Sequence, residues 1–135
     1  MIDYGLINTI KTKLANDEIL GRNGIEASVH SYCPSTKNYP LILLELEEIW
    51  SSLKLGAQSG FTKIKIKAST LSQALSSRES ITISDRIRQL LDGQIIPTED
   101  GKTGIVKLTH STVDIPSTMK PMSVHQYFEI LIRDL

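Results

Sequence analysis

The residues of this sequence best suited to chemistry are one cysteine and three histidines. His30 and Cys33 stand three positions apart, and His110 and His125 follow far along the chain. An H-x-x-C spacing can place two ligands on one zinc ion, and four such residues could converge on a tetrahedral site. The same spacing often arises by chance, and surface histidines or a half-buried cysteine need no metal to explain them. We therefore expect no metal site.

A cysteine and a histidine can also act as a nucleophile and its base. Cys33 precedes Pro34 in a polar loop, and no carboxylate or amide has an evident role in orienting a histidine partner. The paired glutamates at positions 45, 47 and 48 lie where lysines can neutralise them, which favours a structural role over acid–base catalysis. The glycines are scattered through turns and form no phosphate-binding loop. The sequence thus predicts no catalytic residue, no cofactor and no enzyme.

A row of three lysines raises the question whether the chain binds a partner instead. In FTKIKIKAS, residues 61–69, Lys63, Lys65 and Lys67 alternate with apolar residues. This is the period of a strand with one buried and one solvated face. The chain has 15 basic and 15 acidic residues, so its net charge gives no general attraction to nucleic acid. Aromatic residues make up only 5% of the chain and none stands between the lysines, which argues against a stacking surface for single strands.

The strand predicted in LILLELEE offers partners for these lysines. Glu45 and Glu47 share one face of it, and an antiparallel register that sets Glu47 opposite Lys63 also sets Glu45 opposite Lys65. Lys67 then faces no carboxylate. Two interpretations stay open: the row is an ion-pair ladder on the solvated face of a sheet, or it meets another subunit or lines a passage.

Apolar residues in the polar link after this strand are a second candidate contact. Trp50, Leu53 and Leu55 lie in WSSLKLGAQSG, where exposed apolar side chains often mark interfaces. They fit a segment folded back on the sheet equally well. Met119 and Met122, around the loop PSTMKP, fit either an adaptable contact or a gap in the core.

The elements that position these residues follow from hydrophobic periodicity. Ser76-Ser77-Arg78-Glu79 has the form of a capping box, and Asp92-Gly93 supplies a stop for the helix between them, although a start near Thr70 is an alternative. The final segment alternates, with Val124, Gln126, Phe128, Ile130 and Ile132 on one face. The predicted elements are a helix over about 2–15, an irregular strand within 25–32, strands at 41–48 and 62–68, the capped helix, a short apolar piece at 93–97, and strands at about 104–115 and from 122 almost to the terminus.

Each predicted helix has one apolar stripe and most strands have one polar face. We therefore expect a single α+β domain over residues 1–135, with a mostly antiparallel sheet and two helices packed on one face. The longest apolar run is far shorter than the ~20 residues that cross a bilayer, and no signal peptide is evident. The single cysteine excludes an internal disulfide. We expect a cytosolic protein that does not contact a membrane.

The order of these pieces resembles the tail-completion, or tail-terminator, proteins of long-tailed bacteriophages, prophages and gene transfer agents. The resemblance covers nearly the whole chain. Pro40 with the strand 41–44 matches the proline-led hydrophobic strand of that family, and the Ile64/Ile66 strand matches its strand that leads into a helix. His125 and Arg133 match the histidine-led last strand that closes in an arginine.

The resemblance implies a structural role. Members sit as a ring, typically of six subunits, on the head-proximal end of the tail tube, where they stop its polymerisation and give the head a docking surface. The implied partners are other copies of the chain, the tail-tube protein and head-connector proteins, with DNA only as cargo passing through the ring. The implied location is the bacterial cytoplasm during assembly and then the virion tail. No catalytic residues or cofactors come with the family.

A closed ring with head-to-tail contacts needs two different complementary patches on each subunit. The residues that we expect at a subunit or tail interface are Glu45, Glu47, Trp50, Leu53, Leu55, Lys63, Lys65 and Lys67. The main alternative is a small cytosolic α+β module that holds a peptide or ligand against its sheet, and a monomer or dimer with a defined pocket would favour it.

Overall fold

The computed structural model describes residues 4–21, 27–32, 39–52, 60–72, 78–97, 103–114 and 122–134. Several residues named above lie outside these ranges, and what is expected of them stays a prediction: Cys33, Leu53, Leu55, Ser76, Ser77 and Met119. The elements in chain order are α1 (Tyr4–Ala15), β1 (Ser28–His30), β2 (Leu41–Ser52), β3 (Gly60–Ser72), α2 (Arg78–Leu91), β4 (Ile95–Pro97), β5 (Thr103–Asp114) and β6 (Met122–Asp134).

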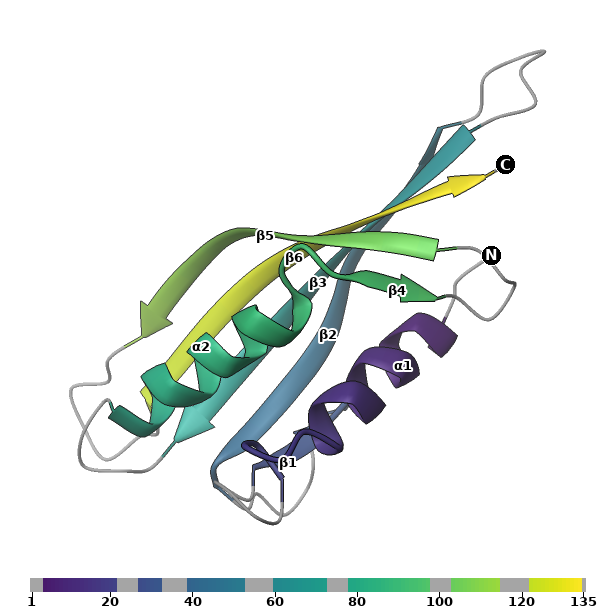
Figure 1. The fold of residues 1–135 in the computed structure, drawn as a ribbon. Coiled ribbons are helices and arrows are strands. Elements are labelled where there is room, and N and C mark those ends of the chain that lie inside the picture. The colour runs from purple at the N-terminus through teal and green to yellow at the C-terminus, as the bar shows by residue number, and fades with distance from the viewer. Residues whose placement is uncertain are drawn as a thin grey trace.

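The described strands form one sheet in the order β1-β2-β3-β6-β5-β4 (Figure 1). β1 pairs in parallel with β2, and the other four neighbouring pairs are antiparallel. The predicted fold class is therefore confirmed. β6, the last strand in the chain, occupies a central place between β3 and β5. β2 and β3 both extend beyond their predicted bounds, and β4 forms where the sequence indicated only a short apolar piece.

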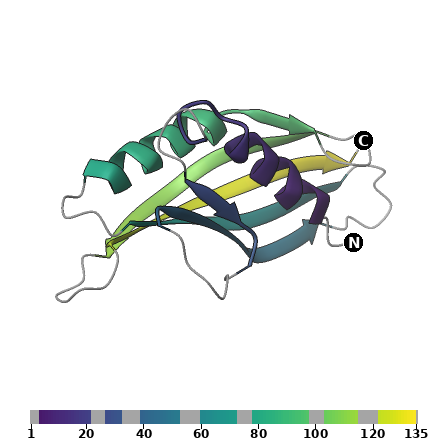
Figure 2. The same cartoon turned by 90° about the horizontal axis from the view of Figure 1, so that it is seen from below.

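Both helices lie on the same face of the sheet (Figure 2). α1 buries Leu6, Ile10 and Leu14, and α2 buries residues four apart at Ile83 and Ile87, so the predicted stripes are confirmed. The alternative helix start near position 70 is wrong. That residue belongs to β3, whose backbone is hydrogen-bonded to strands on both sides through Leu71. None of the described helices is long and apolar enough to span a membrane.

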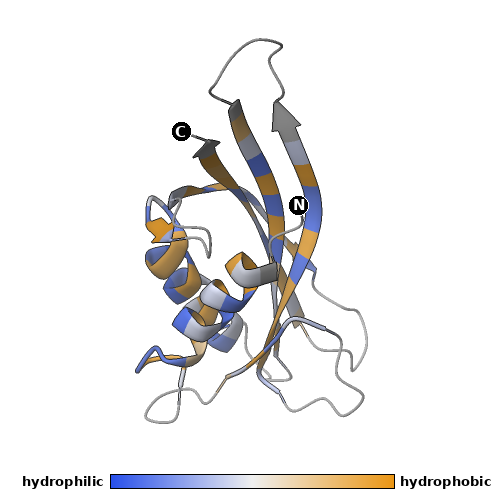
Figure 3. Ribbon diagram, turned by 90° about the vertical axis from the view of Figure 1, so that its right-hand side faces the viewer, coloured by the Kyte–Doolittle hydropathy of each residue, from blue (hydrophilic) through white to orange (hydrophobic). Residues whose placement is uncertain are grey.

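The predicted alternation of the last strand is also confirmed. Val124, Phe128, Ile130 and Ile132 are buried on the face that carries the helices. Gln126 is buried with them because its Nε2 donates a hydrogen bond of 2.8 Å to the backbone oxygen of Ser84 on α2. Figure 3 shows the same alternation as hydrophilic and hydrophobic bands along the strands.

Two β-bulges bend the sheet at one level. β2 carries its extra residue at Glu47, between Leu46 and Glu48, and β5 carries its own at Thr109. Ile66 and Phe128 pair at the centre of the same level. A bulge bends its strand and increases its twist. Two bulges aligned across four strands account for the curl of the sheet in Figure 3.

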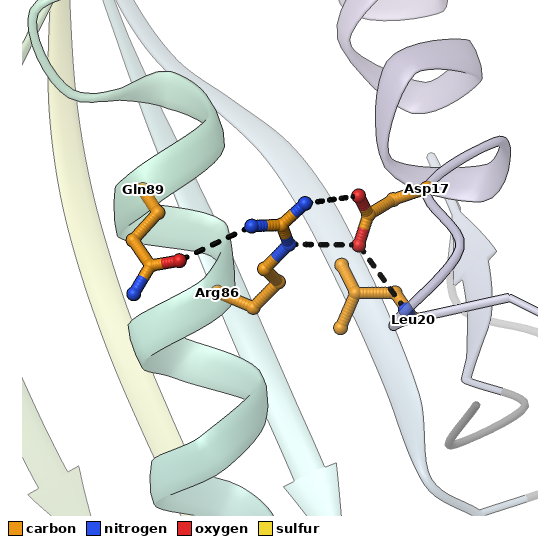
Figure 4. A network of polar contacts seen from close by, with 4 residues as sticks. All are labelled: Asp17, Leu20, Arg86 and Gln89. Atoms are coloured by element: carbon orange, nitrogen blue, oxygen red, sulfur yellow. Dashed lines mark hydrogen bonds and ion pairs between the residues drawn. The ribbon is translucent and has the colours of Figure 1, made fainter.

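A salt bridge joins the end of α1 to α2 (Figure 4). Arg86 donates from Nη2 to Asp17 Oδ1 (2.7 Å) and from Nε to Oδ2 (3.0 Å), and the Leu20 amide also donates to Oδ2 (3.2 Å). The Asp17 side chain is only 6% exposed. The hydrogen bonds from Arg86 lower the pKa of Asp17 below its usual 3.8, although burial opposes this. The same contact raises the pKa of Arg86.

Candidate interaction surface

The face of the sheet opposite the helices carries the lysine row. Because paired residues of neighbouring strands point to the same side, register defines rows of side chains across this outer face. One row alternates in charge and is here called the charged row: Glu48 on β2, Lys65 on β3, Glu129 on β6 and Lys107 on β5. Lys65 Nζ lies 3.6 Å from Glu48 Oε2 and 4.0 Å from Glu129 Oε1. All these side chains are partly exposed, so each pair contributes only about 0–1 kcal/mol.

The predicted register between the two strands is wrong. Glu45 pairs with Lys67 and not with Lys65, and Glu47 sits in the bulge and does not pair with Lys63. Lys67, which was expected to face no carboxylate, lies 3.7 Å from Glu45 Oε1 and 3.8 Å from Glu47 Oε1. The predicted pairing is off by two positions at Glu45 and by three at Glu48. The extra residue in β2 accounts for one position of this difference. The other two depend on the turn between the strands, which alternation does not indicate. The ion-pair ladder exists, with different partners.

Lys63 lies in a second row. Its Nζ is 6.0 Å from the centroid of the Trp50 ring, a cation–π distance, and Trp50 also packs against Phe61 with 5.3 Å between centroids. Beyond Lys63 the row continues through three exposed apolar side chains. We call it the apolar row: Trp50 on β2, Lys63 on β3, Leu131 on β6, Ile105 on β5 and Ile95 on β4.

An open hollow of about 390 Å³ lies between the two bulges on this face. The His110 and Tyr127 rings stack within it, with centroids 4.2 Å apart and planes within 9°. Glu47, Lys65 and Glu129 also line it. A hollow with carboxylates, a lysine and an aromatic pair can receive polar side chains of a partner.

The three histidines do not meet at one site, although His110 and His125 are diagonal neighbours on β5 and β6. His30 lies on β1, near one edge of the sheet, with its ring 6.1 Å from Tyr32 in an edge-on contact. His125, on the central β6, places Nδ1 2.7 Å from Ser69 Oγ, and His110 lies on β5. Within the ranges that the structure describes, no three metal-binding side chains form a group.

Reasoning from the sequence did not identify the residues that β5 and β6 contribute to the outer face. Glu129 and Leu131 stand in the predicted outward half of the last strand, which was the available signal. Lys107 and Ile105 alternate in the same way on β5. What the sequence does not indicate is that β6 lies beside β3 and so brings these residues next to the lysines.

The sequence matches no model of a known protein family and no curated protein. The fold does have a counterpart among solved structures. The chain is similar to a chain of a structure described as the virion of a native gene transfer agent particle, with a TM-score of 0.75 and 9% sequence identity. The match covers 96% of this chain and 96% of that one. At 9% identity, the likeness shows a common fold over nearly the whole length of both.

Proposed function

We propose that this chain is a structural component of a phage-like particle, and that it acts there as a tail-completion protein. The observation that carries the proposal is the likeness of fold to a chain of a gene transfer agent virion, which extends over 96% of each chain. The order of strands and helices in the sequence resembles the tail-terminator family independently of that likeness. A fold alone does not determine function, so the proposal also needs a surface suited to assembly.

The outer face of the sheet supplies that surface. It combines an ion-pair ladder with exposed apolar side chains, of which Trp50 is 48% exposed. This mixture is typical of surfaces that meet other proteins. We assign to the subunit or tail interface the residues predicted from the sequence: Glu45, Glu47, Trp50, Leu53, Leu55, Lys63, Lys65 and Lys67.

In this role, the chain forms a ring of six subunits on the head-proximal end of the tail tube. The ring stops tube growth, and its other side receives the head. DNA passes through the centre without being read, which agrees with a chain whose charges balance at 15 basic and 15 acidic residues.

Light scattering with the tail-tube protein of the same genetic element tests this proposal. We expect either a ring near six times 15.0 kDa in isolation, or assembly of that size only when tube ends are present. A protein that never assembles and ignores the tube protein at both low and moderate salt would contradict the proposal. A ligand screen of the hollow between the bulges would then test the alternative of a small binding module.

A further inference from the structure

The exposed apolar residues of the outer face are gathered in one place. Trp50, Leu131, Ile105 and Ile95 are 48%, 37%, 55% and 66% exposed, and register sets them in one row across the sheet. Single exposed apolar residues are ordinary on a protein surface. A row that carries four of them across five strands favours a surface that a partner covers. Lys63 interrupts the row only partly, because its ammonium lies over the Trp50 ring.

The charged row beside it has an order that limits which surfaces can face it. From β2 to β5 the charges of Glu48, Lys65, Glu129 and Lys107 run minus, plus, minus, plus. Read from β5 to β2, they run plus, minus, plus, minus. The row is therefore complementary to a reversed copy of itself.

We propose that a second copy of this chain packs face to face on the outer face, about a two-fold axis that runs along the strands between β3 and β6. This axis places β2 of one copy over β5 of the other. Each row then faces the same row of the second copy. Glu48 then faces the second copy's Lys107, and Lys65 faces the second copy's Glu129. Each of these contacts occurs twice because the interface is isologous.

The neighbouring rows agree with the same axis. Trp50 faces the second copy's Ile105, and Lys63, whose ammonium lies over the Trp50 ring, faces the second copy's Leu131. Lys67 faces the second copy's Tyr127, a cation over an aromatic ring. Twisted sheets pack face to face with their strands within about 30° of each other, which permits this arrangement.

Other partners fit the alternation less well. A uniformly basic or acidic surface would attract two members of the charged row and be repelled by the other two. An apolar partner would remove water from the charged row and add no counter-charge of its own. The inference concerns the free protein and does not rest on the proposed function. If both hold, the dimer covers the outer face until subunits add to a tube end.

Two charge reversals test the axis. In Lys107→Glu, a glutamate faces Glu48 of the second copy, and in Glu48→Lys, a lysine faces Lys107 of the second copy. Each variant loses two favourable contacts and gains two repulsive ones, so we expect its dimer to dissociate at least about tenfold more readily. An equimolar mixture of the two variants restores every opposite-charge contact in a mixed dimer. Lys11→Glu on α1, on the helical side, is the charge-matched control.

The measurement is mass by sedimentation or light scattering over a concentration series. We expect wild-type protein and Lys11→Glu to reach twice 15.0 kDa, each reversal alone to stay closer to one subunit, and their mixture to recover the dimer. For the apolar row, Ile105→Ser weakens the dimer. Ile81→Ser on α2, where Ile81 is 48% exposed, does not. Added salt weakens the wild-type dimer, because the charged row remains partly solvated.

A wild-type protein that stays monomeric into hundreds of micromolar overturns the inference. So does a dimer that is indifferent to both reversals, or a mixture that fails to re-form one. A mass near six subunits overturns the dimer but leaves the proposed function standing. A dimer that obeys the reversals but never assembles on tube ends supports the inference while the proposed function fails.

Discussion

At the scale of single residues, Asp17 and Arg86 form the contact that links the end of α1 to α2. The aspartate accepts two hydrogen bonds from the guanidinium and one from the Leu20 amide. A carboxylate held by this many donors contributes to stability only while it is ionised. The pH dependence of unfolding therefore reports on this contact.

Asp17→Asn is expected to lower the free energy of unfolding by about 1–2 kcal/mol at neutral pH, because charged hydrogen bonds are lost. The pKa of Asp17 is depressed from 3.8, so its contribution is complete above that value and is lost as the pH falls through the folded-state pKa. Denaturant titrations from about pH 7 down towards pH 2 should find that the free energies of unfolding of wild type and variant approach each other. Asp85→Asn, at a 59% exposed side chain, is the control and should change stability by less than about 0.5 kcal/mol. If the free energies of unfolding of wild type and Asp17→Asn differed by the same amount at all pH values, the stabilising role of the ionised Asp17 would be contradicted.

Gly104 is buried in β5, where the packing leaves no room for a side chain. A Cβ at this position would lie 2.7 Å from Ile130 Cγ2 and 3.3 Å from Ile132 Cγ1. These carbons belong to stiff β-branched side chains on the neighbouring strand. Gly104→Ala should destabilise the protein by about 1–3 kcal/mol by overpacking. Thr103→Ala, at the exposed neighbouring position, should have little effect in the same thermal unfolding experiment.

Residue types and spacing were enough to predict which side of each strand is buried. The alternation in β6 correctly placed Gln126 inward, although a buried glutamine needs a partner, here Ser84, that only the folded chain identifies. Partners across strands were harder to predict. Lys65 meets Glu129 because two strands far apart in the sequence are neighbours in the sheet.

At the scale of elements, the two aligned bulges set the geometry of the outer face. Glu47 and Thr109 are the extra residues, and each reverses which alternate residues point outward after it. In β2 the only mark in the sequence is the doubled polar pair Glu47-Glu48, which breaks the alternation before Ile49, and Thr109 stands in a polar run that carries no such mark. The bulge at Glu47 explains one position of the register error, because strict alternation was carried through it, and the remaining two positions depend on the turn between β2 and β3. The parallel β1 is likewise placed by tertiary contact, with a strand of only Ser28–His30.

Deletion of Glu47 tests the role of the bulge in β2. Without it, β2 alternates regularly through Leu46 and Glu48, so Glu48 still pairs with Lys65 on the outer face, but the bend that the bulge gives the strand is lost. We expect a loss of about 1–3 kcal/mol, since the straightened strand must shift against the core that packs on the curved sheet. Glu47→Ala keeps the chain length and should cost less than about 1 kcal/mol. Equal stability of the deletion and the substitution, measured by chemical denaturation, would show that the bulge is dispensable.

At the scale of the whole molecule, the structure separates a helical side from an open sheet. The core lies between the helices and the sheet, and the outer face contributes charged pairs and exposed apolar groups. Fold class was predictable from periodicity because every long element has one apolar side. The order of strands was not, since chain order gives no signal that β6 inserts between β3 and β5.

Lys65→Glu tests whether the outer face acts in assembly. The variant loses contacts to Glu48 and Glu129, but its side chain is 45% exposed, so the melting temperature should fall by only a few degrees, equivalent to about 1 kcal/mol. Self-association or binding to tube ends should weaken by a much larger factor, because a reversed charge at an interface repels its counterpart. Lys11→Glu should leave assembly unchanged. If Lys65→Glu lowers melting and assembly in proportion, the lysine row is only an intramolecular ladder.

The most direct test of the central claim is the growth of tail tubes in the presence of this protein, followed by electron microscopy. The tail-tube protein of the same genetic element is allowed to polymerise with increasing amounts of the chain. If the chain acts as a tail-completion protein, we expect the tubes to become shorter as its amount rises and a ring to appear at one end only. Tubes of unchanged length with bare ends, at concentrations where the protein is folded, would contradict the account.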